Sequence, residues 1–174
     1  EKSEAYKAGY LNICEIGKER IRRAGKKIKE DNKDKPGIDR LDTGFRVLKL
    51  DSSNMEDVFY TPDKFDASKL FIDNVKPNRT PEDLLFQVML MLGIEISATI
   101  VERTISGKKV FSVMNDFLIA CFDTDIDESV ITDIAKLKPI HFVMRDSSMT
   151  SDNVADNFEQ IFRTYSNGTN RFIL

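Results

Sequence analysis

Apolar residues recur at three- and four-residue spacing between residues 10 and 30, which predicts a long amphipathic helix. Its narrow apolar stripe consists of Ile13, Ile16, Gly17, Ile21, Ala24 and Ile28. Asn12 stands where an N-cap residue is expected, and Glu15 follows at the third helical position, as in a capping box. The polar segment 31–40 contains Pro36-Gly37 and predicts a linker, so we expect a domain boundary there.

Two short elements are predicted after this linker. The segment TGFRVLKL (43–50) predicts a strand, and DASKLFIDNV (66–75) predicts a short helix. The strand leads into Asp51-Ser52-Ser53, and the same Asp-Ser-Ser run recurs at 146–148 after another predicted strand. Exposed backbone N–H groups after a strand bind anions in some proteins, but Asp and Ser are also the usual capping residues. Capping is the favoured interpretation of the repeat.

The clearest helix is predicted at TPEDLLFQVMLMLG (80–93). Thr80 occupies the N-cap position, Pro81 opens the first turn, Asp83 completes a capping box and Gly93 ends the helix. Its apolar residues form a broad face that we expect to be buried: Leu84, Leu85, Val88, Met89 and Leu92. Methionines on such a face favour core packing over a binding groove.

A hairpin is predicted next, because residues 98–105 and 108–114 flank the two-residue turn Ser106-Gly107. A third strand is expected at 116–123. The remaining elements are a helix at 127–138, a strand at 139–145, a helix at 151–165 and a strand at 170–174. The last helix is expected to bury Val154, Phe158, Ile161, Phe162 and Tyr165. Together these elements predict an α/β fold whose mixed sheet, with an antiparallel hairpin and βαβ units, follows a long N-terminal helix.

Charge is divided unevenly along the 174 residues, whose net charge is −3. Residues 1–35 hold eleven basic and seven acidic residues, whereas residues 36–174 hold fifteen and twenty-two. Nucleic-acid affinity comes mostly from neutralising phosphates, so any DNA contact is expected on the basic helix. The candidate residues are Lys18, Arg20, Arg22, Arg23, Lys26, Lys27 and Lys29. The alternative is that these side chains are the solvated back of a packed helix.

The remaining sequence features narrow the class of protein. No apolar run is long enough to span a bilayer and EKSEAYK is not a signal peptide, so we expect a cytoplasmic protein without a membrane partner. The chain has no initiator Met, which indicates a fragment. Cys14 and Cys121 are expected to be reduced, and together with the lone His141 they do not provide a typical zinc site.

Motifs of catalysis are missing. The chain has no Walker loop, Gly-x-Gly-x-x-Gly run, His-Glu-x-x-His or Gly-x-Ser-x-Gly elbow, and SGKK (106–109) is interpreted as a hairpin turn. His141 stands among apolar residues and is expected to be packed rather than catalytic. We therefore predict no catalytic, cofactor-binding or metal-binding residue. A complete enzyme with an active site of another kind stays as a minor alternative.

Several long stretches carry a family resemblance: CEIGKERIRRAGKKIKED, GFRVLKLDSSNMEDVFY, RTPEDLLFQVMLMLGI, GKKVFSV, LIACFD, VMRDSSM and NFEQIF. Together they resemble the C-terminal part of the modification subunit of type III restriction–modification systems, over nearly the whole chain. This resemblance implies a parent enzyme that methylates the exocyclic amine of adenine in a specific DNA sequence, with S-adenosylmethionine as cofactor. It also implies partners, namely DNA, a second modification subunit and the helicase–nuclease restriction subunit.

The resemblance assigns no site residue to this chain. ICEIGKERI (13–21) resembles the helix that follows the cofactor-ribose strand of amino-methyltransferases, and that strand would precede Glu1. The Asp-Pro-Pro-Tyr and Phe-x-Gly-x-Gly loops of such enzymes do not occur here. We therefore expect residues 1–35 to be a helix from the edge of the catalytic fold plus a linker. Residues 36–174 are expected to be a C-terminal α/β module that binds no cofactor and serves subunit assembly, with DNA-backbone contact through helix residues 18–29 as the alternative.

Overall fold

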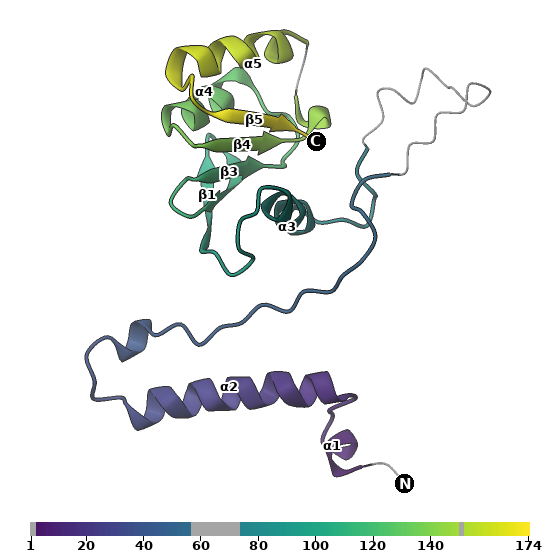
Figure 1. Ribbon diagram of the computed structural model, residues 1–174, viewed down its shortest axis with the longest axis vertical. Helices are drawn as coiled ribbons and strands as arrows, with labels where there is room; N and C mark the ends of the chain where they lie inside the picture. Colours follow the sequence, from purple (N-terminus) through teal and green to yellow (C-terminus); the bar gives the residue numbers. More distant parts are fainter. Residues whose placement is uncertain (1–2, 57–73, 150–151) are drawn as a thin grey trace, which may run out of the picture. The chain divides into compact units, whose positions relative to one another are not determined.

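The computed structural model describes residues 3–56, 74–149 and 152–174, of which 152–156 are described by their backbone alone (Figure 1). The chain divides into two compact units, Glu1–Leu50 and Asp51–Leu174. Residues 36–50, which were expected in the C-terminal module, belong to the first of these units. The α/β fold predicted from the sequence is confirmed, with a mixed sheet and a long N-terminal helix.

The N-terminal unit is built around one helix. A short helix α1 (Glu4–Lys7) precedes α2 (Ile13–Asp31), whose N-cap Asn12 accepts a hydrogen bond from the Glu15 amide at 3.0 Å. A 3₁₀ turn η1 (Ile38–Arg40) follows, and Gly37 enters it with a left-handed φ of 80°. The chain then forms neither helix nor strand from residue 41 to residue 50 and follows an extended course (Figure 1). The helix and the first half of its predicted capping box are thus confirmed.

The strand predicted at 43–50 is wrong, because this segment has no ladder partner among the described residues. It lies along α2 instead, where Thr43 contacts Gly25 and the Arg22 guanidinium lies 5.6 Å from the centre of the Phe45 ring. Alternating side chains favour an extended backbone locally, but a strand also needs a neighbouring edge to pair with. The helix predicted at 66–75 falls almost wholly outside the described residues.

The C-terminal unit contains a five-stranded sheet in the order β1-β2-β3-β4-β5. Its elements are α3 (Pro81–Met91), β1 (Ile100–Ile105), β2 (Lys108–Val113), β3 (Leu118–Cys121), α4 (Glu128–Lys136), β4 (His141–Met144), η4 (Asp146–Ser148), α5 (Asp152–Tyr165) and β5 (Asn170–Ile173). Strands β1, β2 and β3 pair antiparallel, and β3, β4 and β5 pair parallel. The predicted hairpin and the two crossover helices are therefore present.

Two turns of the antiparallel part use left-handed backbone. Ser106 and Gly107 have φ of 47° and 80°, which suits a two-residue hairpin turn. Residues 114–116 in the β2–β3 turn also have positive φ, although none is glycine. The Asp116 amide and carboxylate both bind the Ser112 hydroxyl, and Arg103 forms an ion pair with the same carboxylate at 3.0 Å. These side chains hold a turn that its backbone alone would disfavour.

Both faces of this sheet are covered by helices. Helices α4 and α5 cover one face, around a core that includes Ile119, Phe142 and Phe162. Helix α3 covers part of the other face with Leu84, Leu85, Val88 and Met89 fully buried, as predicted, and Leu92 partly buried. In α5, Phe158 and Phe162 are buried, but Tyr165 is 43% exposed and its predicted burial is wrong. That ring lies at the end of α5 beneath the Lys136 ammonium instead.

Candidate functional site

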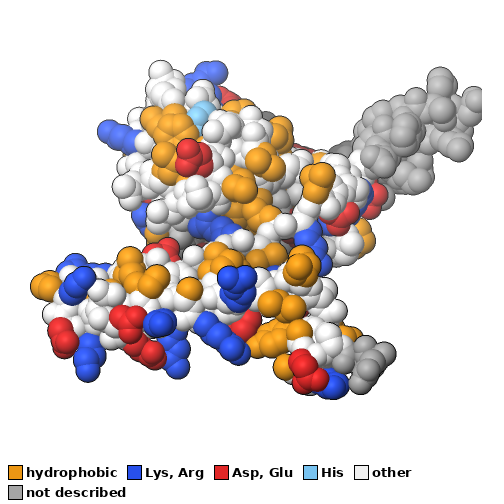
Figure 2. All heavy atoms as spheres, turned by 60° about the horizontal axis from the view of Figure 1, so that its bottom comes forward, with side chains coloured by type: hydrophobic (Ala, Val, Ile, Leu, Met, Phe, Trp, Pro, Cys, Tyr) orange, Lys and Arg blue, Asp and Glu red, His pale blue; other side chains and the backbone are white. Residues whose placement is uncertain are grey.

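The basic helix α2 is the first candidate site, and Figure 2 shows its Lys and Arg side chains at the surface together with hydrophobic ones. Three of the seven candidate residues form ion pairs one turn away: Lys18 with Glu15 at 2.7 Å, Arg23 with Glu19 at 2.7 Å, and Lys26 with Glu30 at 3.7 Å. The hydrogen bond from Lys18 lowers the pKa of Glu15. Such exposed pairs are screened by salt and reduce the net charge available to DNA.

The other candidates differ in their surroundings. Arg22 stacks over Phe45, so its guanidinium is partly occupied within the N-terminal unit. Arg20 and Lys27 are exposed, and Lys29 is half-buried. Within the part of the chain that the structure describes, no ion pair involves Arg20, Lys27 or Lys29.

The seven residues do not form one continuous patch. At 100° per residue, Lys18, Arg22 and Lys29 lie on one side of α2, beside the extended segment. Arg20, Arg23 and Lys27 lie on the far side, and an acidic row separates the two groups: Glu15, Glu19 and Glu30. The helical projection of the sequence already contained this signal, which a count of basic residues overlooks.

Four of the six residues of the apolar stripe of α2 are exposed, whereas Ile16 and Gly17 are half-buried. Ile13 is 81% exposed, Ile21 49% and Ile28 48%, and Ala24 is exposed too. We call these four residues the open stripe. Gly25 is the single buried residue of the helix, and it lies against Thr43 rather than within the stripe. The apolar side of an amphipathic helix normally packs against a core, so an exposed stripe of this length is typical of a contact surface.

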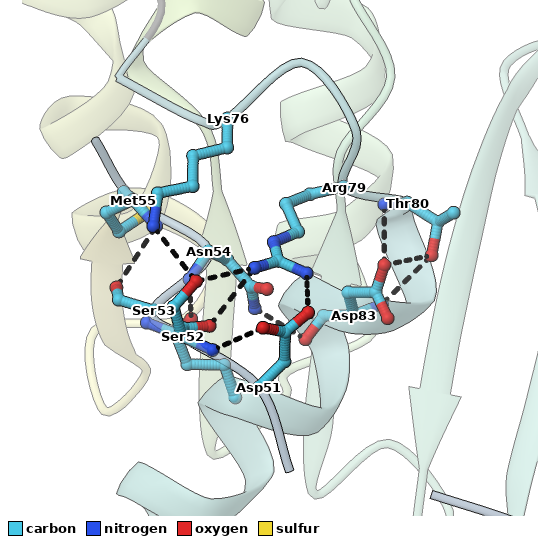
Figure 3. A network of polar contacts seen from close by, with 10 residues as sticks. Asp51, Ser52, Ser53, Asn54, Met55, Lys76, Arg79, Thr80 and Asp83 are labelled. Carbon is cyan, nitrogen blue, oxygen red and sulfur yellow. Dashed lines mark hydrogen bonds and ion pairs between the residues drawn. The ribbon is translucent and has the colours of Figure 1, made fainter. Parts of the chain in front are cut away.

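A polar network at the start of the C-terminal unit is the second candidate site (Figure 3). The side chain of Arg79 is only 10% exposed, and it donates to Asp51 Oδ2 at 2.8 Å and to Ser52 Oγ at 3.0 Å. Lys76 Nζ donates to the same Ser52 hydroxyl at 3.2 Å. The hydrogen bond from Arg79 is the main cause that lowers the pKa of Asp51. The arginine is thus neutralised by a carboxylate within the network.

The network joins residues 51–56 to α3. Asn54 Nδ2 donates to the Asp83 carbonyl at 2.9 Å, and the Asn54 amide donates to Gln87 Oε1 at 3.3 Å. Asp83 and Thr80 form the predicted capping box at the start of the helix. Since Asp51 and Asp83 both face this cluster, it disfavours an anionic ligand, and its role is to attach the segment to the helix. No local sequence pattern predicted the ion pair of Arg79, because its partner Asp51 is 28 residues away.

The repeated Asp-Ser-Ser run does not have one common role. Asp51 binds Arg79 and is not the N-cap of any helix in the described ranges. In the second copy, residues 146–148 form η4 after β4, with Ser148 buried and its carbonyl accepting from the Ile126 amide at 2.8 Å. The capping interpretation is therefore wrong for both runs.

Lys109 of β2 forms ion pairs with α3 and with β1 on the surface of the C-terminal unit. Its Nζ lies 2.9 Å from Glu82 of α3 and 3.2 Å from Glu102 of β1, and 4.7 Å from the centre of the Phe111 ring. The Glu82 hydrogen bond is the main cause that raises the pKa of Lys109. Here the ammonium already occupies the space between the carboxylates, and the contact is structural.

The remaining single residues have packing environments. His141 begins β4, half-buried between the rings of Phe117 at 5.1 Å and Phe172 at 5.8 Å. Cys14 is exposed in α2, whereas Cys121 is buried in β3, where burial raises the pKa of its thiol to about 11. The two cysteines are free and belong to different units.

Among the described residues, no three His, Cys, Asp or Glu side chains come together as a metal site, and no helix in those ranges has the length and apolarity to cross a membrane. No protein-family model matches the chain, and no curated protein matches it either. The resemblance to modification subunits therefore rests on the motifs quoted from the sequence.

Proposed function

We propose that this chain is the C-terminal part of a type III modification subunit, a cytoplasmic, S-adenosylmethionine-dependent DNA adenine methyltransferase. In this proposal the C-terminal unit serves assembly, by contacting the second modification subunit or the helicase–nuclease restriction subunit. The open stripe of α2 is the observation that carries the assignment. It lies in ICEIGKERI (13–21) and the residues that follow, the stretch that resembles a helix packed beside the cofactor-binding sheet of amino-methyltransferases.

Charge supports the assembly role of the C-terminal unit. Residues 51–174 hold twelve basic and twenty acidic residues, a balance that opposes autonomous binding to phosphates. Both sheet faces are packed, but Leu90 and Met91 on α3 stay 66% and 70% exposed. Exposed apolar residues surrounded by polar surface are typical of protein contacts.

Binding experiments test the assembly role directly. We expect residues 1–174 to bind either the full modification subunit or the restriction subunit in a pull-down, and Leu90→Glu with Met91→Glu to weaken that capture. Leu137→Glu with Ile140→Glu is the matched control, since these two residues are also exposed but leave α3 unchanged. A chain that is monomeric by size exclusion and captures neither subunit contradicts the assembly role.

DNA contact through α2 is the second candidate function, favoured by the exposed Arg20 and Lys27, which form no ion pair with any described residue. Replacing both by Gln in the full subunit should lower the salt dependence of duplex binding. The slope of the logarithm of the binding constant against the logarithm of the salt concentration should become shallower by about 0.9 for every phosphate that the variant no longer neutralises. Lys18→Gln with Lys26→Gln is the control, because those side chains are already paired with glutamates. An unchanged slope in the Arg20 and Lys27 variant contradicts DNA contact by this side of the helix.

A methyl-transfer assay distinguishes the full subunit from residues 1–174. The full subunit should transfer the methyl group of S-adenosylmethionine to adenine in duplex DNA, whereas residues 1–174 should neither transfer it nor bind the cofactor. Methyl transfer by residues 1–174 alone would instead support the minor alternative of a complete enzyme with an unrecognised active site.

A further inference from the structure

The two edges of the sheet in the C-terminal unit carry different side chains. In the described structure the sheet ends at β1 on one side and at β5 on the other (Figure 1). Strand β1 has Glu102 and Arg103 in its middle, and two β1 strands centred on either residue would place like charges opposite each other. The one charged residue of β5 is Arg171, whose guanidinium donates to both carboxylate oxygens of Glu159 at 3.0 Å. The charges of β5 therefore do not oppose pairing with a further strand.

The backbone of β5 offers hydrogen-bonding groups on its outer side. The amides of Asn170 and Leu174 donate to carbonyl groups at or next to the two ends of β4, at 2.8 and 2.9 Å. In a parallel ladder, the residues between such positions point their N–H and C=O groups away from the neighbouring strand. The backbone groups of Arg171 and Ile173 therefore point outward. Within the part of the chain that the structure describes, no strand lies on that side.

The side chains at this edge are apolar on both faces of the sheet. Phe172 is 40% exposed, and Ile173, which points to the opposite face, is 46% exposed. The centre of the Phe172 ring lies 5.8 Å from that of His141 in β4, which lies 5.1 Å from that of Phe117. A row of rings thus crosses the sheet and ends at its edge with Phe172. Apolar side chains exposed on an edge strand favour contact with another strand.

Two copies of β5 match each other about Phe172. Two-fold pairing of identical edge strands is antiparallel, and a centre at Phe172 aligns Arg171 with Ile173 of the second copy. The outward backbone groups of these residues then exchange hydrogen bonds, as an antiparallel ladder requires. The two Phe172 rings become direct neighbours in a non-hydrogen-bonded pair, where Cα atoms are about 4.5 Å apart and side chains are closest. No like charges of β5 face each other in this register.

The helix layer leaves room for this pairing. Helix α5 lies over β4 and β5, because the Phe162 ring lies 5.3 Å from the Phe142 ring of β4 and 5.8 Å from the Arg171 guanidinium of β5. Strands about 4.8 Å apart then place the two α5 helices about 10 Å apart, which is the width of a helix. Arg171 contacts Glu159, and the exposed Arg163 follows one turn later on the same side of α5. The two antiparallel helices therefore present an acid and a base to each other.

We propose that the C-terminal units of two copies of this chain pair antiparallel along β5, with Phe172 at the two-fold axis, so that their sheets become continuous. A second copy fits this edge because one register satisfies the outward backbone groups, the aromatic contact and the charges together. The inference goes beyond the proposed assembly role and does not rest on it, since it concerns residues 1–174 alone.

Sedimentation of residues 1–174 measures the association. The chain should sediment as a species of twice 19.9 kDa at high concentration and should dissociate on dilution. Phe172→Asp places two carboxylates at the axis and should raise the dissociation constant by at least about tenfold. Val101→Asp in β1 is the matched control, because Val101 is 45% exposed at the other edge, and it should leave the constant unchanged. Circular dichroism and denaturant unfolding check that both variants are folded.

A cross-link at the axis tests the register without a charged substitution. In a chain that carries Cys14→Ser, the variant Phe172→Cys should form a disulfide between two copies on mild oxidation. The Cα separation of a non-hydrogen-bonded pair, about 4.5 Å, lies within the range that disulfides span. Val101→Cys in the same chain should form none.

The contrary results are specific. A chain that stays monomeric at every concentration and gives no cross-link through Phe172→Cys overturns the proposal. A dimer that Phe172→Asp leaves intact also overturns it, and if Ile21→Glu dissociates that dimer, the contact is the open stripe. A monomeric chain that still captures the restriction subunit refutes the pairing alone. A dimer through β5 in a full subunit that does not methylate DNA refutes the proposed function alone.

Discussion

The two units of this chain use similar helices in opposite ways. Helix α4 buries Val130, Ile131, Ile134 and Ala135 against the sheet of the C-terminal unit. Helix α2 has an equally regular apolar stripe, yet Ile21 and Ile28 are about half exposed. Periodicity thus determines which side of a helix is apolar, whereas burial depends on whether a second layer is present.

The layers explain why the difference arises. Strand β3 has helices over both faces, and all four of its residues are buried. The extended segment 43–50 has α2 on one side and no paired strand in the described structure. Most of the free energy of folding comes from apolar burial, so the C-terminal unit should be stable by itself, and the N-terminal unit should depend on added cover.

Core truncation should give the largest contrast between the units. Phe142→Ala in β4 removes a buried ring whose centre lies 5.3 Å from that of Phe162, and it should lower the free energy of unfolding by about 3–5 kcal/mol. Ile21→Ala removes a half-exposed side chain and should cost under about 1 kcal/mol. Denaturant unfolding of each variant measures both values. Equal losses would show that the stripe is as well covered as the core.

A glycine pair within α2 tests the packing of the extended segment. A Cβ at Gly25 would lie 2.8 Å from Thr43 Cβ, so Gly25→Ala should displace the segment at a cost on the order of 1–3 kcal/mol. A Cβ at Gly17 would meet no heavy atom within 4 Å beyond the adjoining backbone of the helix, so Gly17→Ala should stabilise the helix by about 0.5–1 kcal/mol. Circular dichroism and the Thr43 amide resonance report these changes. Stabilisation by both variants would place the segment away from Gly25.

The helix cap of the C-terminal unit should have a smaller effect. Thr80 Oγ1 accepts from the Asp83 amide at 3.2 Å, and Thr80→Ala should destabilise the unit by about 1 kcal/mol. Loss of the hydroxyl should also raise the pKa of Asp83, in part, since the Thr80 backbone bond that lowers it most remains. Thr80→Ser keeps the hydroxyl and should restore both properties in unfolding and NMR titrations. A Ser variant as weak as the Ala variant would argue against the cap.

The smallest expected effect is the loss of stability at low pH that follows protonation of Asp51. Arg79 holds the pKa of this carboxyl below its unfolded value of about 3.9, so its stabilising contribution is complete above that pH. The contribution is lost as the pH falls through the lower, folded-state pKa. Unfolding measured between about pH 5 and pH 2 should therefore show a shallower acid loss in Asp51→Asn than in the parent chain. Added salt should narrow the difference, because Asp51 is exposed.

The parts of the fold that sequence predicted are those fixed within a few residues. The capping box of Thr80 and Asp83 spans four positions, and the Ser106-Gly107 turn joins adjacent strands. In each case the residues that form the contact lie within a few positions of one another, so the local sequence is enough to predict it. The ion pair of Asp51 with Arg79 has no such local signal, because its two residues lie 28 positions apart and the sequence offers many other acids and bases.

The candidate site shows the same limit. The local sequence predicted a strand at 43–50 but did not reveal the missing ladder, because pairing depends on another edge. The end of α5 was predicted from period alone, and Tyr165 lies beyond the reach of the core. The seven basic residues of α2 were correctly placed on a helix, but the pairing of Lys18, Arg23 and Lys26 with glutamates depends on side-chain positions that a charge count omits.

The unequal burial of the two cysteines has a practical consequence for spectroscopy. Only a thiolate reacts rapidly with maleimides, and the buried Cys121, with its pKa raised to about 11, stays protonated at neutral pH. Cys14 is exposed in the first turn of α2, next to Ile13 of the open stripe. The unmodified chain therefore accepts a single fluorophore or spin label at this position, without cysteine replacement. Such a label would report when the stripe becomes covered.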